Sequence, residues 1–422
     1  MNFRELKLED LSAVTTSIDE DAYQVAREIV ADVFQRGELA IREFAAKYDG
    51  MGEQDNLFVS REELQVALDQ IETETRELLQ RTAERIRSFA QHQRESIQDV
   101  SVEVPGGHAG HRWLPLQSAG CYAPAGRYPL PSSVLMTAVT ARVAGVKQVW
   151  VASPKPNAIT LAAAAVAEAD GVLTVGGAQA IAALAAGVST VVPPCDVVVG
   201  PGNRYVTAAK WIVSRFTKID MLAGPSELVV VAGEDANPAF VAADLLAQAE
   251  HDVDARPILI TDSKQLLADV KTELEKQLGE LPTSQVAVQA LSAGGYCLVS
   301  GLDEAVECCE VIAPEHLSLQ GSTFESNADL FRAGAALFVG AMTPEVLGDY
   351  GAGPNHVLPT GGTARSQSGL SVFTFMRCQT RLQIESPKSA HKLFADARML
   401  GETEGLTGHA RSSEIRSDAI QP

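Results

Sequence analysis

The chain has 422 residues, of which 46% are hydrophobic and 21% charged, a composition typical of a globular protein with a large buried core. Its formal charge is −20 and only 5% of its residues are aromatic. Nucleic acids attract basic surfaces and stacking aromatic side chains, so we expect no nucleic-acid partner. The N-terminus is charged from the start, and every apolar run is shorter than the roughly 20 residues of a membrane span. We therefore expect no membrane partner and a cytoplasmic location.

Six cysteines are scattered along the chain with no Cys-x-x-Cys spacing. This pattern argues against a disulfide framework and against a thiolate zinc site. The cysteines are Cys121, Cys195, Cys297, Cys308, Cys309 and Cys378.

The first part of the chain is predicted to be helical. Apolar residues recur at helical spacing over 21–48 and again after residue 60. Ser60 and Glu63 form a capping-box pattern at the start of the second helix. From 100 to 117 the pattern changes to short strands and turns, and from 120 to 232 strands alternate with helices. This repetition is typical of a parallel, doubly wound α/β unit.

Three glycine-rich turns follow predicted strands, at 122–127, 176–179 and 200–203. In doubly wound folds, ligands bind beyond the carboxyl ends of the strands, where such turns let backbone amides approach phosphates. None of the three matches the full G-x-G-x-x-G fingerprint. The turns together favour a nucleotide site, and tight turns without a ligand remain the alternative.

An acidic and an imidazole side chain are adjacent at Glu315 and His316, behind a proline and ahead of an apolar alternation. Neighbouring residues of a strand point in different directions, so we expect these two side chains to have different tasks. They are either two proton carriers at one centre, or one ligand and one orienting group. An ordinary strand start with a solvated Glu and a packed His is the alternative.

Four further polar residues stand out by their surroundings. Gln248 and His251 are three apart near a predicted helix end, Asp349 lies in a glycine-rich loop, and His409 follows a glycine in the C-terminal segment. Two imidazoles, a carboxylate and an amide oxygen form a donor set suited to zinc. A capped helix end, a turn cap and an exposed tail remain the alternatives, because the four come from remote segments.

The chain resembles the histidinol dehydrogenase family from about residue 20 to 416. The resemblance rests on the segments VGGAQAIAAL, VVGPGN, AGPSE, DLLAQAEHD, APEHL, GDYGAGPNHVLPTGGTAR, SGLSV and EGLTGHA. It implies a zinc enzyme that completes histidine biosynthesis, oxidising L-histidinol through an aldehyde to L-histidine with two NAD. It also implies a homodimer with one zinc per subunit, whose active site is completed by the C-terminal segment of the other subunit.

The resemblance also assigns roles at matching positions. It implies catalytic roles for Glu315 and His316. The implied zinc ligands are Gln248, His251, Asp349 and His409. The implied substrate contacts are Ser226, Gln248, His251, His316, Asp349, Glu404 and His409. The implied NAD contacts are Tyr122, Gln179 and Asn203, one in or beside each of the three glycine-rich turns.

The fold that the resemblance implies consists of two Rossmann-like, aldehyde-dehydrogenase-like doubly wound domains with small helical extensions that mediate dimerisation. We expect the first domain to comprise 20–119 and 230–368, with most of the catalytic and zinc residues. The second, on the NAD side, is expected to span 120–229. The extensions are expected at 1–19 and 369–422.

Two other functions remain as alternatives. A paralogous zinc and NAD dehydrogenase would act on another alcohol, such as a sulfonated diol. A metal- or nucleotide-binding scaffold without turnover is disfavoured, because both presumed catalytic residues and all four presumed ligands are present. Cys121 or Cys195 is a rival nucleophile for the aldehyde step, but neither has a His or Lys activator in the sequence. Ser318, Arg204 and Gly408 depart from the family pattern and leave fine specificity open.

Overall fold

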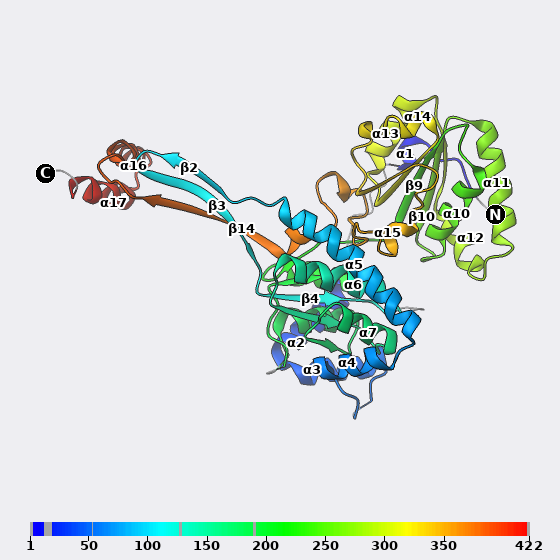
Figure 1. The fold of residues 1–422 in the computed structure, drawn as a ribbon, viewed down its shortest axis with the longest axis horizontal. Helices are drawn as coiled ribbons and strands as arrows, with labels where there is room; N and C mark the ends of the chain where they lie inside the picture. The colour runs from blue at the N-terminus through cyan, green and yellow to red at the C-terminus, as the bar shows by residue number, and fades with distance from the viewer. Residues whose placement is uncertain (1–2, 12–18, 53, 126–128, 189–190, 420–422) are drawn as a thin grey trace. The chain divides into compact units, whose positions relative to one another are not determined.

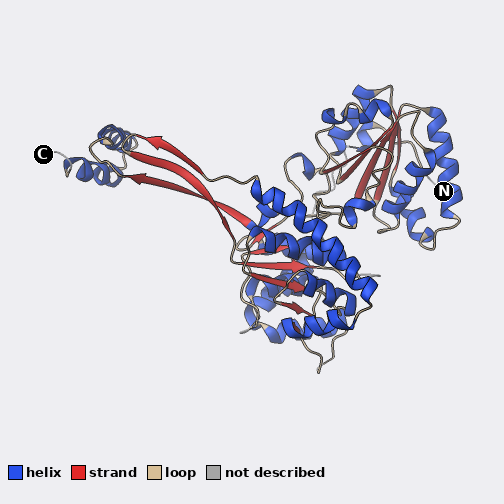
Figure 2. Ribbon diagram, viewed as in Figure 1, coloured by secondary structure: helices blue, strands red, loops and turns tan. Residues whose placement is uncertain are grey.

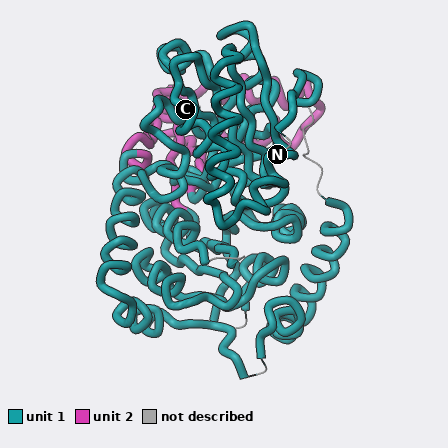
Figure 3. The backbone as a smooth tube through the Cα atoms, turned by 90° about the vertical axis from the view of Figure 1, so that its right-hand side faces the viewer, with its two compact units in different colours: residues 1–92, 116–375 teal, residues 93–115, 376–422 magenta. Residues whose placement is uncertain are grey.

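The computed structural model describes residues 3–11, 19–52, 54–125, 129–188 and 191–419. The chain forms two compact units, one of residues 1–92 with 116–375 and one of residues 93–115 with 376–422 (Figure 3). The larger unit contains a six-stranded and a five-stranded sheet flanked by helices, and the smaller unit a three-stranded sheet (Figure 2). The predicted α/β class with parallel sheets is thus confirmed. Within the described residues, no helix has both the length and the apolar character to cross a membrane.

The six-stranded sheet has the order β1-β6-β5-β4-β7-β8. All its neighbours are parallel except β1, which pairs antiparallel with β6 at one edge. After the edge strand β1, the chain enters the parallel part centrally at β4, winds outward through β5 and β6, and then returns to the other side for β7 and β8. Its strands are β1 Phe58–Ser60, β4 Ser118–Tyr122, β5 Gln148–Ala152, β6 Gly171–Leu173, β7 Val197–Val199 and β8 Lys218–Ile219.

Helices cover this sheet, and its central strands are fully buried, as expected for parallel strands. The helices are α2 Glu20–Arg36, α3 Glu38–Phe44, η1 Ala45–Asp49, α4 Arg61–Gln70, α5 Thr73–Glu95, α6 Pro131–Ala144, α7 Ala158–Val166, α8 Gly177–Ala186 and α9 Arg204–Val213. The single helix predicted over 21–48 is divided at Gly37, whose φ of 59° ends α2. The predicted capping box of Ser60 and Glu63 is present at α4.

The N-terminal helices pack against this sheet. Ala26, Ile29 and Ile41 share one apolar cluster with Tyr122 and with α8 and α9. The sequence-based division grouped 20–119 with 230–368, whereas the apolar faces of α2 and α3 are buried against the sheet that contains β4. The functional division into domains remains a prediction.

The five-stranded sheet has the order β11-β10-β9-β12-β13 and is parallel throughout. It is wound like the parallel part of the first sheet, from central β9 outward to β11 and then, on the other side of β9, to β13. Strands β9 and β10 are labelled in Figure 1. Successive residues of β9 face two separate apolar clusters, one with α10–α12 and one with α1 and α13. Its strands are β9 Glu227–Ala232, β10 Arg256–Thr261, β11 Gly295–Leu298, β12 His316–Gln320 and β13 Ala336–Val339. Its helices are α1 Leu8–Leu11, α10 Pro238–Ala249, α11 Lys264–Leu278, α12 Ser284–Ala293, α13 Leu302–Ile312, α14 Ser322–Glu325, η2 Ala328–Leu330 and α15 Val346–Asp349.

The larger unit ends with two short 3-10 helices, η3 Thr363–Arg365 and η4 Val372–Phe375. The smaller unit follows, an antiparallel sheet β14-β3-β2 with two helices. The strands predicted between 100 and 117 are confirmed. The C-terminal part is less helical than expected, because it contributes a nine-residue strand before its helices. These elements are β2 Val100–Val104, β3 Gly107–Pro115, β14 Met376–Ile384, α16 His391–Thr403 and α17 Thr407–Asp418.

Candidate active site

Glu315 and His316 lie at the amino end of β12. Helix α13 ends at Ile312, and its cap residue Ala313, with a φ of 47°, turns the chain toward the strand. Both side chains are buried, at 6% and 5% exposure. We expected them to point apart, but Glu315 Oε2 lies 3.8 Å from His316 Nδ1. The alternation of a strand does not apply here, because Glu315 precedes its first residue.

Both side chains contact the backbone of one residue on the neighbouring strand. The Glu227 N–H donates to Glu315 Oε2 at 2.9 Å, and His316 Nδ1 lies 3.1 Å from the Glu227 carbonyl oxygen. Because a carbonyl oxygen only accepts, Nδ1 of a neutral His316 carries the proton and Nε2 keeps its lone pair. The imidazole is thereby oriented as a base through Nε2.

Burial shapes the acid–base properties of this pair. Desolvation lowers the pKa of His316 to about 4, so the imidazole is neutral at pH 7 and able to accept a proton. Desolvation also raises the pKa of Glu315 well above its usual range, against the hydrogen bond from Glu227. The carboxylates of Glu227, Asp349 and Glu345 raise it further.

A group of metal-ligating side chains lies in the same unit. Ligand atoms of His251, Glu345 and Asp349 lie within 4.8 Å of one another, and His251 Nε2 is 3.6 Å from Asp349 Oδ2. His251 follows the end of α10, and its N–H donates to the carbonyl of Gln248 at 3.4 Å. The two are therefore adjacent at a helix end, although they do not share the regular helix face expected from their spacing.

Gln248 supplies an independent indication of a metal site. Its side chain is fully buried, yet neither its amide oxygen nor its amide nitrogen has a hydrogen-bond partner among the described residues. Unpartnered buried polar atoms are rare and unfavourable in folded proteins. An amide oxygen, an imidazole and a carboxylate also fit zinc by donor type. The residues present therefore fit the predicted metal.

Glu345 was not among the predicted site residues. It is 1% exposed, and both carboxylate oxygens lack partners among the described residues. Desolvation raises its pKa well above the usual range, and the charges of Asp349 and Asp244 add to the effect. The only signal in the sequence was that Glu345 lies four residues before Asp349. This spacing places the two side chains on the same side only once residues 346–349 are known to form a helix.

Glu404 and His409 belong to the smaller unit. Glu404 caps the end of α16, and His409 lies in the first turn of α17; both are exposed. The C-terminal segment, for which an exposed tail was the alternative, is thus helical at His409. The approach of either side chain to the group around Asp349 remains a prediction.

The three predicted cofactor residues all follow carboxyl ends of strands in the six-stranded sheet. Tyr122 ends β4, and its hydroxyl accepts from the Gly177 N–H at 3.2 Å. Gln179 lies in the first turn of α8. Asn203 caps α9, its Oδ1 accepting from two backbone N–H groups. A Cβ on Gly200 would lie 2.0 Å from the Tyr122 carbonyl, so the turn at 200–203 packs directly against the end of β4.

Asp49 is a second residue that sequence reasoning missed. Its Oδ2 accepts from the Gly176 N–H at 2.9 Å and from Gln179 Nε2 at 3.1 Å. It therefore fixes the amide of Gln179 with Oε1 available as an acceptor. No signal in the sequence links Asp49 to a turn about 130 residues away. Of the turn predicted at 122–127, residues 126 and 127 lie outside the described residues.

The remaining candidates have structural surroundings. The backbone of Ser226 accepts from the Arg256 N–H at 3.0 Å, directly before β9. Burial raises the pKa of the Cys121 thiol to about 12 and that of Cys195 above its usual range, so neither is poised as a nucleophile. His356 Nδ1 lies 2.9 Å from the carbonyl of Asp349.

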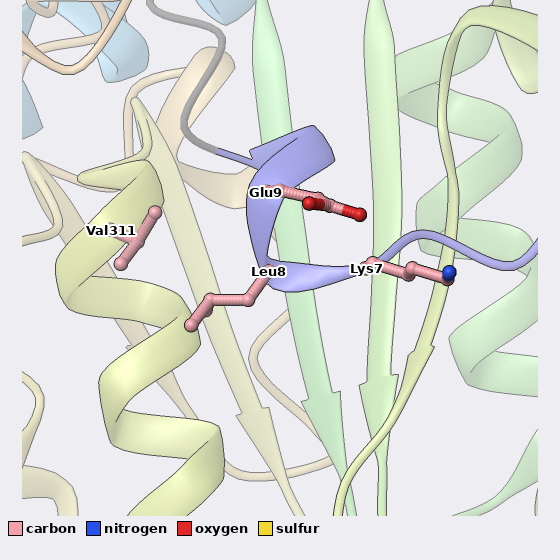
Figure 4. Close-up of a pocket in the computed structure, with 4 residues that line it drawn as sticks. All are labelled: Lys7, Leu8, Glu9 and Val311. Atoms are coloured by element: carbon pink, nitrogen blue, oxygen red, sulfur yellow. The ribbon is translucent and has the colours of Figure 1, made fainter.

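A separate pocket between the N-terminal segment and α13 is lined by Lys7, Leu8, Glu9 and Val311 (Figure 4). Its lining contains none of the predicted site residues.

Comparison with known proteins identifies the family. The profile described as histidinol dehydrogenase matches residues 13–417. The chain belongs to the histidinol dehydrogenase family. It is 42% identical to the histidinol dehydrogenase of Rhodopseudomonas palustris, with 97% of this chain and 96% of the relative covered. It is 41% identical to the enzyme of Pseudomonas syringae pv. syringae, at 94% and 90% coverage.

A solved structure agrees with this assignment. The crystal structure of histidinol dehydrogenase from Elizabethkingia anophelis matches with a TM-score of 0.91 and 31% identity, covering 99% of this chain and 97% of that one. The assignment to histidinol dehydrogenase, an oxidoreductase of histidine biosynthesis, is therefore confirmed. It is favoured over the paralogous dehydrogenase that the sequence left as an alternative.

Proposed function

We propose that the chain is a zinc-dependent histidinol dehydrogenase that oxidises L-histidinol through L-histidinal to L-histidine with two NAD. Family membership supports the reaction. The observation that carries the metal is the fully buried Gln248 amide, which has no partner among the described residues. The carbonyl of Gln248 accepts from the N–H of His251, which belongs to the group with Asp349.

Three of the proposed zinc ligands, Gln248, His251 and Asp349, come from one subunit, and the fourth is His409 of the partner subunit. Each subunit would bind one zinc. When bound, zinc would hold the imidazole and amine of the substrate and so orient its alcohol carbon. Glu345 offers a further buried carboxylate at the same place. The proposed substrate contacts are Ser226 and Glu404, in addition to the four zinc ligands and His316.

His316 is the proposed base for the alcohol. Its Nε2 accepts the hydroxyl proton while the carbon-bound hydrogen leaves as hydride to the nicotinamide, which gives the aldehyde and NADH. Holding the alcohol carbon against the nicotinamide is the positional part of this step. The neutral, oriented imidazole described above fits the role.

Glu315 is the proposed base for hydration of the aldehyde. It takes a proton from water as the water oxygen adds to the carbonyl carbon, and the carbonyl oxygen takes up a proton in turn, which yields the hydrate. His316 then accepts a hydroxyl proton of the hydrate while a second hydride leaves to a second NAD. The product is the carboxylate of L-histidine, so the first half-reaction releases one proton and one NADH, and the second releases two protons and one NADH.

The proposed NAD contacts are Tyr122, Gln179 and Asn203. They are supported by their common position beyond the carboxyl ends of β4, β6 and β7. Helices α6, α8 and α9 begin there, and helix N-termini favour phosphate groups. We further propose that both sheets form Rossmann-like, aldehyde-dehydrogenase-like domains, since the parallel strands of each are wound outward in two directions from a central strand.

The enzyme is proposed to be a cytoplasmic homodimer in which the C-terminal segment of each subunit completes the other's site. The smaller unit carries exposed apolar side chains that a second copy would cover. They are Leu382, Met399, Leu400, Leu406 and Ile415, between 44% and 67% exposed. The segments 1–19 and 369–422 are the proposed dimerisation extensions.

The decisive assay is NADH formation by the purified, zinc-loaded protein. Two NADH per L-histidinol are expected, together with little turnover of a sulfonated diol. Absence of turnover on histidinol would contradict the proposal, and faster turnover of the diol would favour the paralogous dehydrogenase.

The separate role of Glu315 is tested by Glu315→Gln, with each half-reaction measured alone. Oxidation of supplied histidinal should fall far more than oxidation of histidinol, because only the former needs hydration. Equal losses in both would contradict the division between Glu315 and His316.

A further inference from the structure

Glu227 contacts both presumed proton carriers through its backbone. It is the first residue of β9, the central strand, and directly precedes Leu228, which pairs with His316 of β12. Its N–H donates to Glu315 Oε2, and its carbonyl accepts from His316 Nδ1. A single residue therefore determines where the carboxylate lies and which imidazole nitrogen is free.

The side chain of Glu227 is held from two other directions. Its Oε1 lies 3.4 Å from Nη1 of Arg256, which begins β10, and its Oε2 accepts from the Gly361 N–H at 3.2 Å. The loop that contains Gly361 also contacts the segment before β9, because Thr360 Oγ1 accepts from the Gly224 N–H at 2.5 Å. The carboxylate of Glu227 thus bridges Arg256 and Gly361, while the backbone of the same residue contacts Glu315 and His316. A change at the carboxylate therefore moves the backbone atoms that contact these two side chains.

We propose that Glu227 is a positioning residue for both proton-transfer steps, held in place by Arg256 and Gly361. The proposal rests on the proposed roles of Glu315 and His316. Glu227 is not assigned a contact with substrate. Its function is to keep the Glu315 carboxylate and the His316 imidazole aligned while each acts in turn.

The chemistry of the position supports a function beyond folding. Glu227 is 4% exposed and lies beside a second buried carboxylate, Glu315, with Arg256 as the cation that contacts it. Burying a carboxylate is costly unless it is paired, and a second nearby carboxylate raises the cost. An apolar residue would begin a buried strand at lower cost, so the carboxylate is explained by the contacts that it makes.

The test uses Glu227→Gln in the zinc-loaded enzyme. A Gln oxygen can accept from Arg256 or from Gly361, while its amide group faces the other donor, so one side of the bridge is lost. We expect kcat of both half-reactions to fall about tenfold or more, because small misplacements of catalytic groups have large effects. KM for histidinol and NAD should stay within about threefold and the zinc content unchanged. The solvent deuterium isotope effect on kcat should rise as proton transfer becomes limiting.

Two further variants separate positioning from folding. Arg256→Lys keeps a cation for Glu227 and should retain more kcat than Arg256→Gln. Glu325→Gln is the matched control, because Glu325 Oε1 also accepts from a glycine N–H, at 2.9 Å, but beyond the opposite end of β12. It should leave kcat unchanged.

Several results would overturn the proposal. One is a wild-type kcat in Glu227→Gln. Another is a loss of kcat that is fully accounted for by lower zinc content or a lower folded fraction. A third is a rise in KM at constant kcat. Equal activity of Arg256→Lys and Arg256→Gln would contradict the bridge. If the wild-type enzyme itself fails to oxidise histidinol, the proposed function fails instead, and the two failures are distinguished in the same assay.

Discussion

The two parallel sheets of the larger unit are wound in the same order, yet their candidate functional residues lie at opposite ends. In the six-stranded sheet the predicted cofactor residues follow the carboxyl ends of β4, β6 and β7. In the five-stranded sheet Glu315 and His316 lie at the amino end of β12, and Glu227 begins β9. We expected ligands at carboxyl ends, and the second sheet departs from that rule.

Helix polarity explains the difference. At the carboxyl edge of a parallel sheet the following helices begin, so unpaired N–H groups and the positive dipole end favour phosphates. At the amino edge helices end, and their carbonyls favour cations. Helix α10 ends beside Gln248 and His251, and α13 ends just before Glu315. One fold thus offers an anion-favouring edge on one sheet and a cation-favouring edge on the other.

Buried charge follows the same division. The five-stranded sheet and its helices bury the acids Glu227, Asp244, Glu315 and Glu345. In the six-stranded sheet the buried Lys210 is paired with Asp220. Variants at each edge should therefore affect different functions.

The largest effect is expected for His316→Gln. Loss of the base should lower kcat about 10²- to 10⁴-fold while NAD affinity, measured by titration, stays within about twofold. The matched control is His92→Gln on an exposed helix, which should be neutral. Weakened NAD binding by His316→Gln would break the separation of the two edges.

The next effect is expected for Gln248→Leu, with two readouts of opposite sign. Zinc affinity should fall at least about 10- to 100-fold, because a ligand is lost. The metal-free protein should become more stable by about 1–3 kcal/mol, because two unpartnered buried polar atoms are removed. Metal titration and urea unfolding without zinc measure the two. A destabilised metal-free protein would show that the amide has an unseen partner.

A smaller effect is expected at the other edge for Asp49→Asn. The variant disturbs the acceptor that orients Gln179, so KM for NAD should rise about five- to tenfold, or about 1 kcal/mol. Zinc content and KM for histidinol should not change. Asp55→Asn is the control, since Asp55 also accepts from a glycine N–H, at 2.8 Å, in an exposed turn. A fall in zinc content would contradict separate edges.

The smallest effect is a pH-dependent change in stability at Asp244. Burial raises its pKa to about 6, although Gln320 Nε2 donates to it at 2.8 Å. A raised carboxyl pKa means that the folded state binds the proton more tightly than the unfolded state. The favourable contribution is thus full below the ordinary pKa near 4 and is lost as pH rises through 6.

Asp244→Asn should therefore raise the free energy of unfolding at pH 8 by about 1–3 kcal/mol and change it little at about pH 3, below the ordinary carboxyl pKa. Urea unfolding at both values measures this. A stabilisation of equal size at both pH values would exclude titration of Asp244 as the cause.

The sequence predicted elements well where one pattern dominates. Buried valine runs and capping residues placed most strands and helices between 120 and 312. It missed β14 because Met376–Ile384 is exposed along most of its length and shows no buried alternation. It missed the division at Gly37 because the apolar spacing continues across it.

Site prediction depended on whether a residue's partners are close in the chain. The QAEH spacing already indicated Gln248 and His251. Glu345 and Asp49 acquire meaning only from folding, one through a four-residue helix and the other through a hydrogen bond to Gln179. The orientation of Glu315 and His316 was equally hidden, because Glu227 lies on a different strand.

His356 uses both nitrogens to connect the two edges. Its Nδ1 lies 2.9 Å from the Asp349 carbonyl, and its Nε2 lies 3.3 Å from Oγ of Ser133 in the first turn of α6, which begins beyond β4. Asn355 Nδ2 also donates to the Met136 carbonyl on α6. A displacement of α6 is therefore transmitted to the backbone of a presumed metal ligand. If binding of NAD at one edge changes the affinity for zinc at the other, binding of zinc must change the affinity for NAD by the same factor.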